Sequence, residues 1–180
     1  MPGDERELVW TALRWPSLEH VVVTFGADGA MSSSGVAVAV LDGLPTRLAY
    51  QLVTDERGAV RRVHLTGPRR TLSLAADGHG HWDSHRELDG CIDVDIAITP
   101  LTNTLPIRRL ALLRGASAEI DLAYVSVPDL IVTRATQRYT RTETGYRYES
   151  GTFRADLQVD PDGLVTTYSD LWRREPPSPG

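Results

Sequence analysis

The chain has 180 residues, of which 41% are hydrophobic and 24% are charged, and its formal net charge is −5. This length and balance are typical of one globular domain with a core of its own. The acidic balance argues against nucleic acid or an anionic membrane surface as the main partner, since both attract a basic surface. No run of residues approaches the roughly 18 consecutive apolar positions of a transmembrane helix.

The start of the chain and its one cysteine bear on the compartment. The opening residues, MPGDEREL, lack the apolar segment of a signal peptide. Cys91 has no second cysteine to pair with and stands in an apolar run, so we expect a small, buried hydrophobic side chain. We therefore expect a cytoplasmic protein.

Asp-Gly steps, which favour tight hairpin turns, divide the chain into short segments. They are Asp28-Gly29, Asp42-Gly43, Asp77-Gly78, Asp89-Gly90 and Asp162-Gly163. Between them apolar residues alternate with others, as they do along a half-buried strand. In chain order the alternating segments are 21–25, 36–40, 48–52, 72–74, 92–98, 120–124 and 153–159. The segment Ser32-Ser33-Ser34-Gly35 is predicted to be a turn.

Helical signals are weak, because no long window keeps a 3.6-residue period with caps at both ends. The segment 116–127 alternates and is predicted to be a strand, whereas Pro100–Pro106 is predicted to form a turn or one short helical turn. About a dozen strands at roughly 10-residue spacing indicate an all-β fold, with a barrel, a sandwich and a rolled sheet as alternatives. We expect one domain, residues 1–174, followed by a disordered tail, residues 175–180.

The stretch from Gly90 to Leu110, GCIDVDIAITPLTNTLPIRRL, carries the main candidate site. Asp93 and Asp95 are two residues apart on a predicted strand, so both carboxylates point to one face, about 6.5–7 Å apart at the backbone. They are either exposed or ion-paired, or they accept hydrogen bonds from ligand hydroxyl groups, or they form an acid–base pair like that of inverting glycosidases. The candidate arginine partners are Arg108, Arg109 and Arg147.

Two further groups could contact a ligand. Tyr146 and Tyr148, in the segment YRYES, share one side of a predicted strand. They suit either the core or the wall of a sugar or lipid site, because tyrosine rings are apolar with a polar tip. Asn103 lies in the corner Thr99–Pro106, which is either a rigid turn or a lip that contacts the ligand.

Residues 77–85 resemble a metal-binding pattern at first sight. His79, His81, Asp83 and His85 would share one face if this segment were a straight strand. The segment follows a turn and contains Gly78 and Gly80, so solvated histidines are expected and no metal is expected. The chain also lacks a G-x-S-x-G elbow, a P-loop, a G-x-G-x-x-G motif and an H-E-x-x-H motif, and no cofactor is expected.

Three segments closely resemble the family described as "Putative glycolipid-binding", formerly a domain of unknown function. They are Gly90–Leu110, YRYES at Tyr146–Ser150, and FRADLQVDPDGLVTTYSDLW at Phe153–Trp172. Trp10, Leu18-Glu19-His20, Gly35 and Leu48-Ala49-Tyr50 are also similar to the family's pattern, so the resemblance covers nearly the whole chain. The chain departs from it at Ser169-Asp170, where the family tends to carry a proline before the final Leu-Trp.

The resemblance implies a spiral β-roll, a strongly curved and mostly antiparallel sheet similar in shape to bacterial carriers of lipoproteins and lipids. It implies noncatalytic binding of a glycolipid or another amphipathic ligand inside the roll, where each buried methylene contributes about 0.8 kcal/mol. The residues then expected to contact the ligand are Asp93, Asp95, Asn103, Arg108, Tyr146 and Tyr148. The alternatives are a hydrolase that acts on a glycosylated or phosphorylated small molecule through Asp93 and Asp95, and an interaction domain without a ligand.

Overall fold

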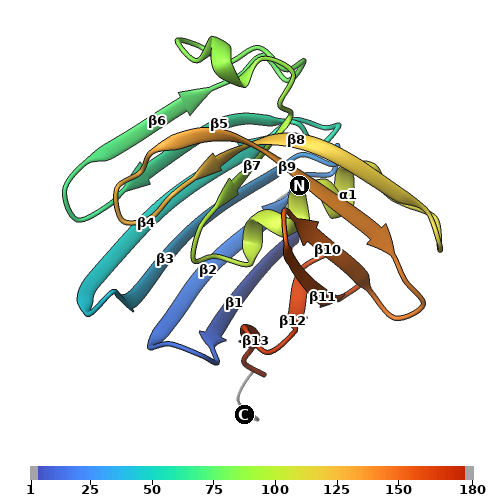
Figure 1. Ribbon diagram of the computed structural model, residues 1–180. Coiled ribbons are helices and arrows are strands. Elements are labelled where there is room, and N and C mark those ends of the chain that lie inside the picture. Colours follow the sequence, from blue (N-terminus) through green and yellow to red (C-terminus); the bar gives the residue numbers. More distant parts are fainter. Residues whose placement is uncertain (1–3, 177–180) are drawn as a thin grey trace.

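The computed structural model describes residues 4–176 as one sheet of 13 strands (Figure 1). The strands are β1 (Asp4–Ala12), β2 (Ser17–Phe25), β3 (Met31–Leu41), β4 (Leu44–Thr54), β5 (Val60–Thr66), β6 (Thr71–Ala75), β7 (Asp93–Ile96), β8 (Ser117–Val125), β9 (Val132–Arg141), β10 (Tyr146–Ser150), β11 (Phe153–Val159), β12 (Val165–Tyr168) and β13 (Trp172–Arg174). Their order is β6-β5-β4-β3-β2-β1-β13-β12-β11-β10-β9-β8-β7. Every neighbouring pair is antiparallel except β7 and β8, which run parallel. The prediction of a single-domain, all-β, mostly antiparallel fold is confirmed.

The two ends of this sheet meet because the sheet rolls inward. The backbone N–H of Val60, at the start of β5, donates to the carbonyl of Ile92, just before β7, at 3.1 Å. Both faces of β7 are covered, since Val94 and Ile96 are buried on one face and Asp93 is buried on the other. Figure 1 shows β7 within the arc that the other strands form. The sheet therefore winds as a spiral and is not closed into a barrel.

The inner face of the roll holds the apolar core. Along β3 the small side chains of Ala37 and Ala39 are buried on this face, whereas Val38 and Val40 point outward with 55% and 39% of their surface exposed. Large, fully buried side chains come from strands all around the roll, and they include Trp10, Leu48, Leu52, Leu65, Ile96 and Leu157. Small residues on one central strand leave room for the large side chains of its neighbours.

Three of the five Asp-Gly steps close hairpins, which join β2 to β3, β3 to β4 and β11 to β12. Asp42 and Gly43 both have positive φ angles, 49° and 80°, as a two-residue hairpin turn of this hand requires. The turn predicted at 32–35 is wrong, because these residues lie within β3 and pair with β2 on one side and β4 on the other. Pairing in the middle of a sheet overrides the local preference of small polar residues.

The helical part of residues 4–176 consists of η1 (Arg86–Leu88), η2 (Leu101–Asn103) and α1 (Thr104–Leu110). Together η2 and α1 extend beyond the single short turn predicted for 100–106. Pro106 lies in the first turn of α1, where its missing N–H removes no helical hydrogen bond. The helix ends at Leu110, and the next residue, Ala111, caps it with a left-handed φ of 43°. None of these helices is long and apolar enough to cross a membrane.

Two local predictions concern the cysteine and the chain end. Cys91 is fully buried and unpaired, as expected. The predicted tail lies outside the described residues apart from Glu175 and Pro176. The backbone N–H of Glu175 donates to the Val9 carbonyl at 2.8 Å, which joins this end of the chain to β1.

Candidate functional site

The six residues predicted to contact a ligand lie in three different environments. Asp93 is covered by an arginine of α1; Asp95, Asn103 and Tyr148 belong to one polar cluster inside the roll; Arg108 and Tyr146 line a separate cavity. The strand register therefore brings some of them together and keeps others apart.

Asp93 is completely buried and forms a bidentate ion pair with Arg109. The Nε atom of Arg109 lies 3.1 Å from Oδ1 and 3.2 Å from Oδ2, and Nη2 donates to Oδ2 as well. Burial raises the pKa of Asp93, and the guanidinium beside it limits that rise. Because both oxygens are occupied, this carboxylate fastens α1 to β7 and presents no free oxygen to a ligand.

Asp95 is only partly buried and is held by neutral groups. Thr102 Oγ1 donates to Oδ1 at 2.9 Å, and Gln137 Nε2 donates to Oδ2 at 2.6 Å. Within residues 4–176 no arginine or histidine nitrogen lies within 4.0 Å of this carboxylate. Burial raises the pKa of Asp95, opposed by the two hydrogen bonds. A carboxylate offers about four acceptor positions, so this one keeps capacity for further donors.

Tyrosine side chains surround Asp95. The Tyr139 hydroxyl lies 3.0 Å from Asn103 Oδ1 and 3.1 Å from Gln137 Oε1, and it can donate to one of them at a time. The Tyr148 ring packs edge-on against Tyr139, with ring centres 5.4 Å apart. Burial, and after it the negative charge of Asp95, raises the pKa of Tyr148. The same two causes raise the pKa of three more tyrosines, Tyr124, Tyr139 and Tyr168. Burial contributes most to each rise, and the Asp95 charge adds to it. We call Asp95, Asn103, Gln137, Tyr139 and Tyr148 the Asp95 cluster.

A third buried carboxylate, Glu19 on β2, holds the loop that follows β7. Its Oε1 accepts hydrogen bonds from the Tyr50 hydroxyl and, at 2.6 Å, from Thr99 Oγ1, whereas its buried Oε2 has no partner within residues 4–176. Burial raises the pKa of Glu19 to about 7. A Cβ atom on Gly35 would come within 2.3 Å of the Tyr50 ring, so only glycine lets Tyr50 cross β3 to reach Glu19.

The cavity that contains Arg108 and Tyr146 has a volume of about 420 Å³ and lies where α1 ends, beside the β11–β12 turn. Arg108 Nη1 donates to the Asp162 carbonyl at 2.7 Å, and its guanidinium lies over the Phe25 ring at 4.3 Å. Arg141 lies over the ring of Tyr146 at 4.7 Å. These contacts place cationic groups at the cavity wall without any contact to Asp95.

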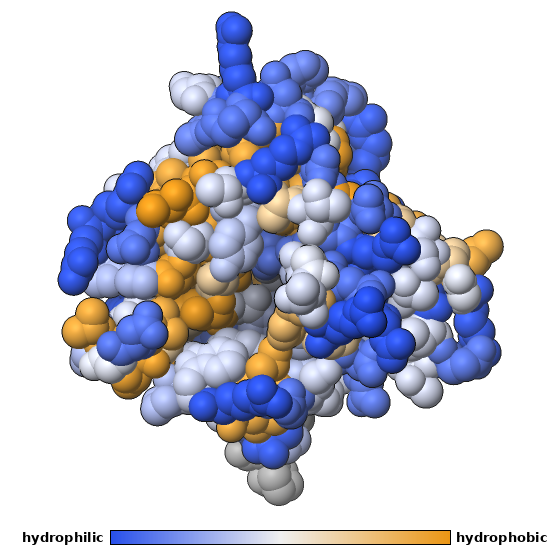
Figure 2. All heavy atoms as spheres, viewed as in Figure 1, coloured by the Kyte–Doolittle hydropathy of each residue, from blue (hydrophilic) through white to orange (hydrophobic). Residues whose placement is uncertain are grey.

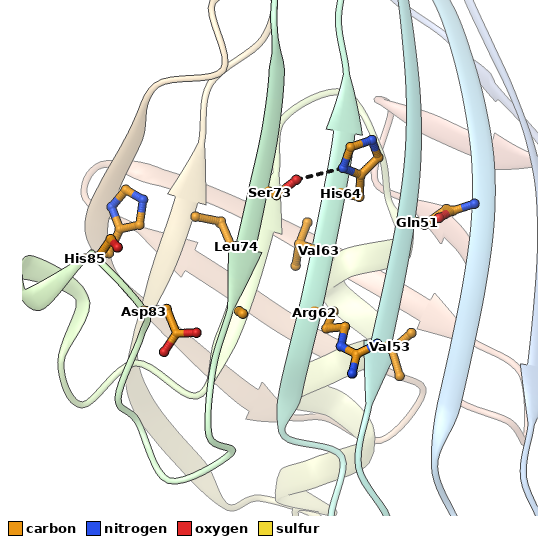
Figure 3. Close-up of a pocket in the computed structure, with 11 residues that line it drawn as sticks. Gln51, Val53, Arg62, Val63, His64, Ser73, Leu74, Asp83 and His85 are labelled. Carbon is orange, nitrogen blue, oxygen red and sulfur yellow. Dashed lines mark hydrogen bonds between the residues drawn. The ribbon is translucent and has the colours of Figure 1, made fainter.

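The outer face of β4, β5 and β6 carries another hollow, of about 480 Å³ (Figure 3). His64 and Ser73 are cross-strand neighbours there, and His64 Nδ1 lies 2.8 Å from Ser73 Oγ. This is the contact of a nucleophile with its base, but within residues 4–176 no carboxylate lies within 4.0 Å of His64 to orient the ring. Figure 3 shows Asp83 and His85 on the far side of β6 from His64. The hollow therefore lacks the third member of a catalytic triad.

The histidines of residues 77–85 do not converge. His79 contacts Arg57, whereas His81 contacts Asp77 at 3.0 Å and His85 contacts Glu87 at 2.7 Å. Turns at Gly78 and Gly80, both with positive φ, bend the segment. Among the residues that the structure describes, no group of three or more histidine, cysteine or acidic side chains could hold a metal ion.

Several polar residues of these sites were not predicted from the sequence. Gln137 and Arg141 lie on β9, which has no apolar alternation to mark it as a strand, because its inward side chains include Ala135, Gln137 and Tyr139. Glu19 shares the inward face of β2 with Val21 and Val23. The alternation along β2 carries that information, and it could have identified Glu19 as a buried acid.

These features describe a class of protein: a single rolled sheet with a polar, tyrosine-rich cluster inside. The family described as "Putative glycolipid-binding" matches residues 7–174, and the chain belongs to it. The crystal structure of a DUF1089 family protein from Pseudomonas aeruginosa is similar, with 37% identity over 87% of this chain and 92% of that chain, and a TM-score of 0.77. No match was found among the curated proteins. The family resemblance drawn from the sequence is confirmed.

Proposed function

We propose that this protein binds an amphipathic, glycosylated ligand without chemical turnover, and that the Asp95 cluster contacts the sugar. The observation that carries this proposal is the state of Asp95: a partly buried carboxylate with no cationic partner within residues 4–176, held by Thr102 and Gln137 and surrounded by tyrosines. Sugar hydroxyl groups donate well to such a carboxylate, and tyrosine rings suit the apolar faces of a sugar.

The surface of the molecule supports an amphipathic ligand. Figure 2 shows a recess near the centre of the face toward the viewer, with hydrophobic residues gathered on its left and hydrophilic residues on its right. A ligand with one apolar and one polar part would match such a border. The description of the family points to the same class of ligand. The cytoplasmic location expected from the sequence stays a prediction.

Hydrolysis by a carboxylate pair is not proposed. Inverting glycosidases need two carboxyl groups that both reach the substrate, one as acid and one as base. Both oxygens of Asp93 are bound by Arg109, and its side chain is fully buried. Asp95 alone can accept a hydrogen bond or a proton, which suits binding better than the concerted action of an acid and a base.

Isothermal titration with n-octyl β-D-glucoside, below its micelle concentration, tests the proposal. We expect saturable binding, and weaker binding of glucose alone, because glucose lacks the apolar part. Asp95→Asn should weaken the binding of octyl glucoside about 10- to 100-fold, the usual cost of losing a hydrogen bond to a charged group. Asp156→Asn is the matched control, since it makes the same chemical change at an exposed pair with Arg147.

Two results would overturn the proposal. One is an affinity for octyl glucoside that is equal in the wild type and in Asp95→Asn, because the cluster would then not contact the sugar. The other is an absence of saturable binding by the wild type. Circular dichroism of both variants confirms that they are folded before the titrations are compared.

A further inference from the structure

The cavity at the end of α1 brings two arginines and two aspartates together, in a chain whose net charge is −5. Arg108 reaches it from α1 and Arg141 from β9, and Tyr146 of β10 forms part of its wall. Both arginine side chains are partly buried. Two guanidinium groups at one small cavity repel each other unless an anion lies between them.

Neither guanidinium is ion-paired within the described part of the chain. Arg108 Nη1 donates to the Asp162 carbonyl and Arg141 Nη1 donates to the Gly145 carbonyl, both at 2.7 Å. Each group also lies over an aromatic ring. A guanidinium has five N–H donors, so most of them remain for a ligand. The carbonyl and the ring hold each arginine in place without neutralising it.

The carboxylates at the cavity pair with other arginines. Asp160 pairs with Arg174 at 2.6 Å, and Asp162 pairs with Arg6 at 2.9 Å. Asp160 Oδ1 also accepts two backbone N–H groups of the β11–β12 turn, each at 3.0 Å. Arg6 is shared between Asp162 and Asp4. Within residues 4–176 neither Asp160 nor Asp162 forms an ion pair with Arg108 or Arg141, whose guanidinium groups stay available to an anion.

Gly163 makes room for this arrangement. Its φ is +81°, and a Cβ atom on it would lie 3.0 Å from Cγ of Arg108. A side chain at this position would be strained by the positive φ and would force Arg108 to shift by a few tenths of an ångström. The same Asp-Gly step that closes the β11–β12 hairpin thus lets the arginine lie directly on the backbone.

We propose that this cavity binds a phosphoryl group, with Arg108 and Arg141 as its donors. Guanidinium groups bind phosphate oxygens through paired hydrogen bonds, and a volume of about 420 Å³ admits a phosphate with a short organic group attached. The phosphoryl group belongs either to a free phosphorylated small molecule or to the head group of a phospholipid. This site is separate from the Asp95 cluster and does not depend on the proposed function.

Titration with inorganic phosphate at constant ionic strength tests the site. We expect Arg141→Gln to weaken phosphate binding by about 10-fold or more. Arg154→Gln is the matched control, because it removes the same charge from an exposed pair with Glu149 on the outer face. Equal affinity in Arg141→Gln and the wild type, or an equal loss in Arg154→Gln, would overturn the proposal.

Amide chemical shifts of the wild-type protein give a test without any variant. Added phosphate should shift the backbone signals of Gly145, Tyr146 and Gly163, which adjoin the cavity. Shifts confined to other parts of the chain would contradict the proposal.

Dihexanoyl phosphatidic acid separates the two sources of the phosphoryl group. Binding about 10-fold tighter than that of inorganic phosphate, and lost in Arg141→Gln, would assign the site to a phospholipid head group. Equal affinity for the two probes would assign it to a free phosphorylated molecule. Octyl glucoside carries no phosphate, so its binding should not change in Arg141→Gln, and the two proposals can fail separately.

Discussion

Asp93 and Asp95 stand two residues apart on the same strand and face the same side, yet they have opposite surroundings. Asp93 is fully buried and bound by Arg109 through both oxygens. Asp95 is partly exposed and receives one neutral hydrogen bond on each oxygen. The first arrangement fastens a helix to a strand, whereas the second keeps a carboxylate able to accept a further donor.

The difference shows that the partner of a buried carboxylate, more than its position on a strand, decides whether it serves stability or binding. The bidentate guanidinium occupies both oxygens of the Asp93 carboxylate, and removing the guanidinium would destabilise the fold because it leaves a buried charge unpaired. Threonine and glutamine satisfy it in part, so the remaining lone pairs can take ligand hydroxyl groups. Glu19 is a third case: one oxygen accepts from two hydroxyl groups, and the other has no donor among residues 4–176.

The largest effect is expected from breaking the Asp93–Arg109 pair. Arg109→Gln should lower the free energy of unfolding by about 3–5 kcal/mol at pH 7, because it leaves a buried carboxylate without a cation. The loss should shrink at pH 4, where a carboxyl with a raised pKa takes up a proton. Urea denaturation at both pH values measures this. A loss below about 1 kcal/mol at pH 7 would show that the pair does not fasten α1.

Glu19 should give the next largest effect, and it depends on pH. Its pKa is about 7 in the folded protein and near 4.5 when unfolded, so the folded state holds a proton that the unfolded state releases. Stability from this group is therefore fully present below pH 4.5 and is lost as pH rises through 7. As pH rises from 4.5 to 8, the free energy of unfolding of Glu19→Gln should therefore increase by about 3 kcal/mol relative to that of the wild type. Urea denaturation of both proteins across that pH range measures this change. A difference in unfolding free energy that stays constant with pH would contradict the prediction.

Asp95→Asn should cost less stability than either of these changes. The asparagine can still accept one of the two hydrogen bonds, so we expect a loss of about 1 kcal/mol in the free energy of unfolding. Removing the negative charge should also lower the pKa of Tyr148, which ultraviolet titration of tyrosinate detects. A loss of several kcal/mol would instead place Asp95 in a structural network like that of Asp93.

The smallest effect is expected at the exposed pair of Arg147 and Asp156, which are cross-strand neighbours on β10 and β11. More than half of each side chain is exposed, and solvent screens such pairs. Arg147→Gln should leave the urea midpoint unchanged within error. A clear shift of the midpoint would mean that the contrast between buried and exposed pairs is overstated.

Local patterns predicted most of the strands, because alternation and Asp-Gly turns act over a few residues. The β8 segment and the inward side of β10, with Tyr146 and Tyr148, agree with those patterns. The helix at 104–110 was underestimated because seven residues are too few to show a helical period. The turn expected at 32–35 was wrong because β3 is paired on both sides.

The partner of each carboxylate was not predictable in the same way. In the sequence three arginines were equivalent candidates for the ion-pair partner of Asp93 or Asp95: Arg108, Arg109 and Arg147. On α1 adjacent residues point about 100° apart, so Arg109 faces β7 while Arg108 faces the cavity. Arg147 pairs with Asp156 across the sheet. Such choices depend on helix rotation and on strand register between segments far apart in the chain.

Short-range periodicity and long matching segments were enough to predict the all-β class, the family and the shared face of Asp93 and Asp95. Tertiary structure alone decided that β7 lies inside the roll, that Asp93 meets Arg109, and that Asp95 meets Gln137 from an unpredicted strand. The physical reason is that burial and electrostatic pairing depend on how a curved sheet winds over its own first strands, which no local pattern encodes.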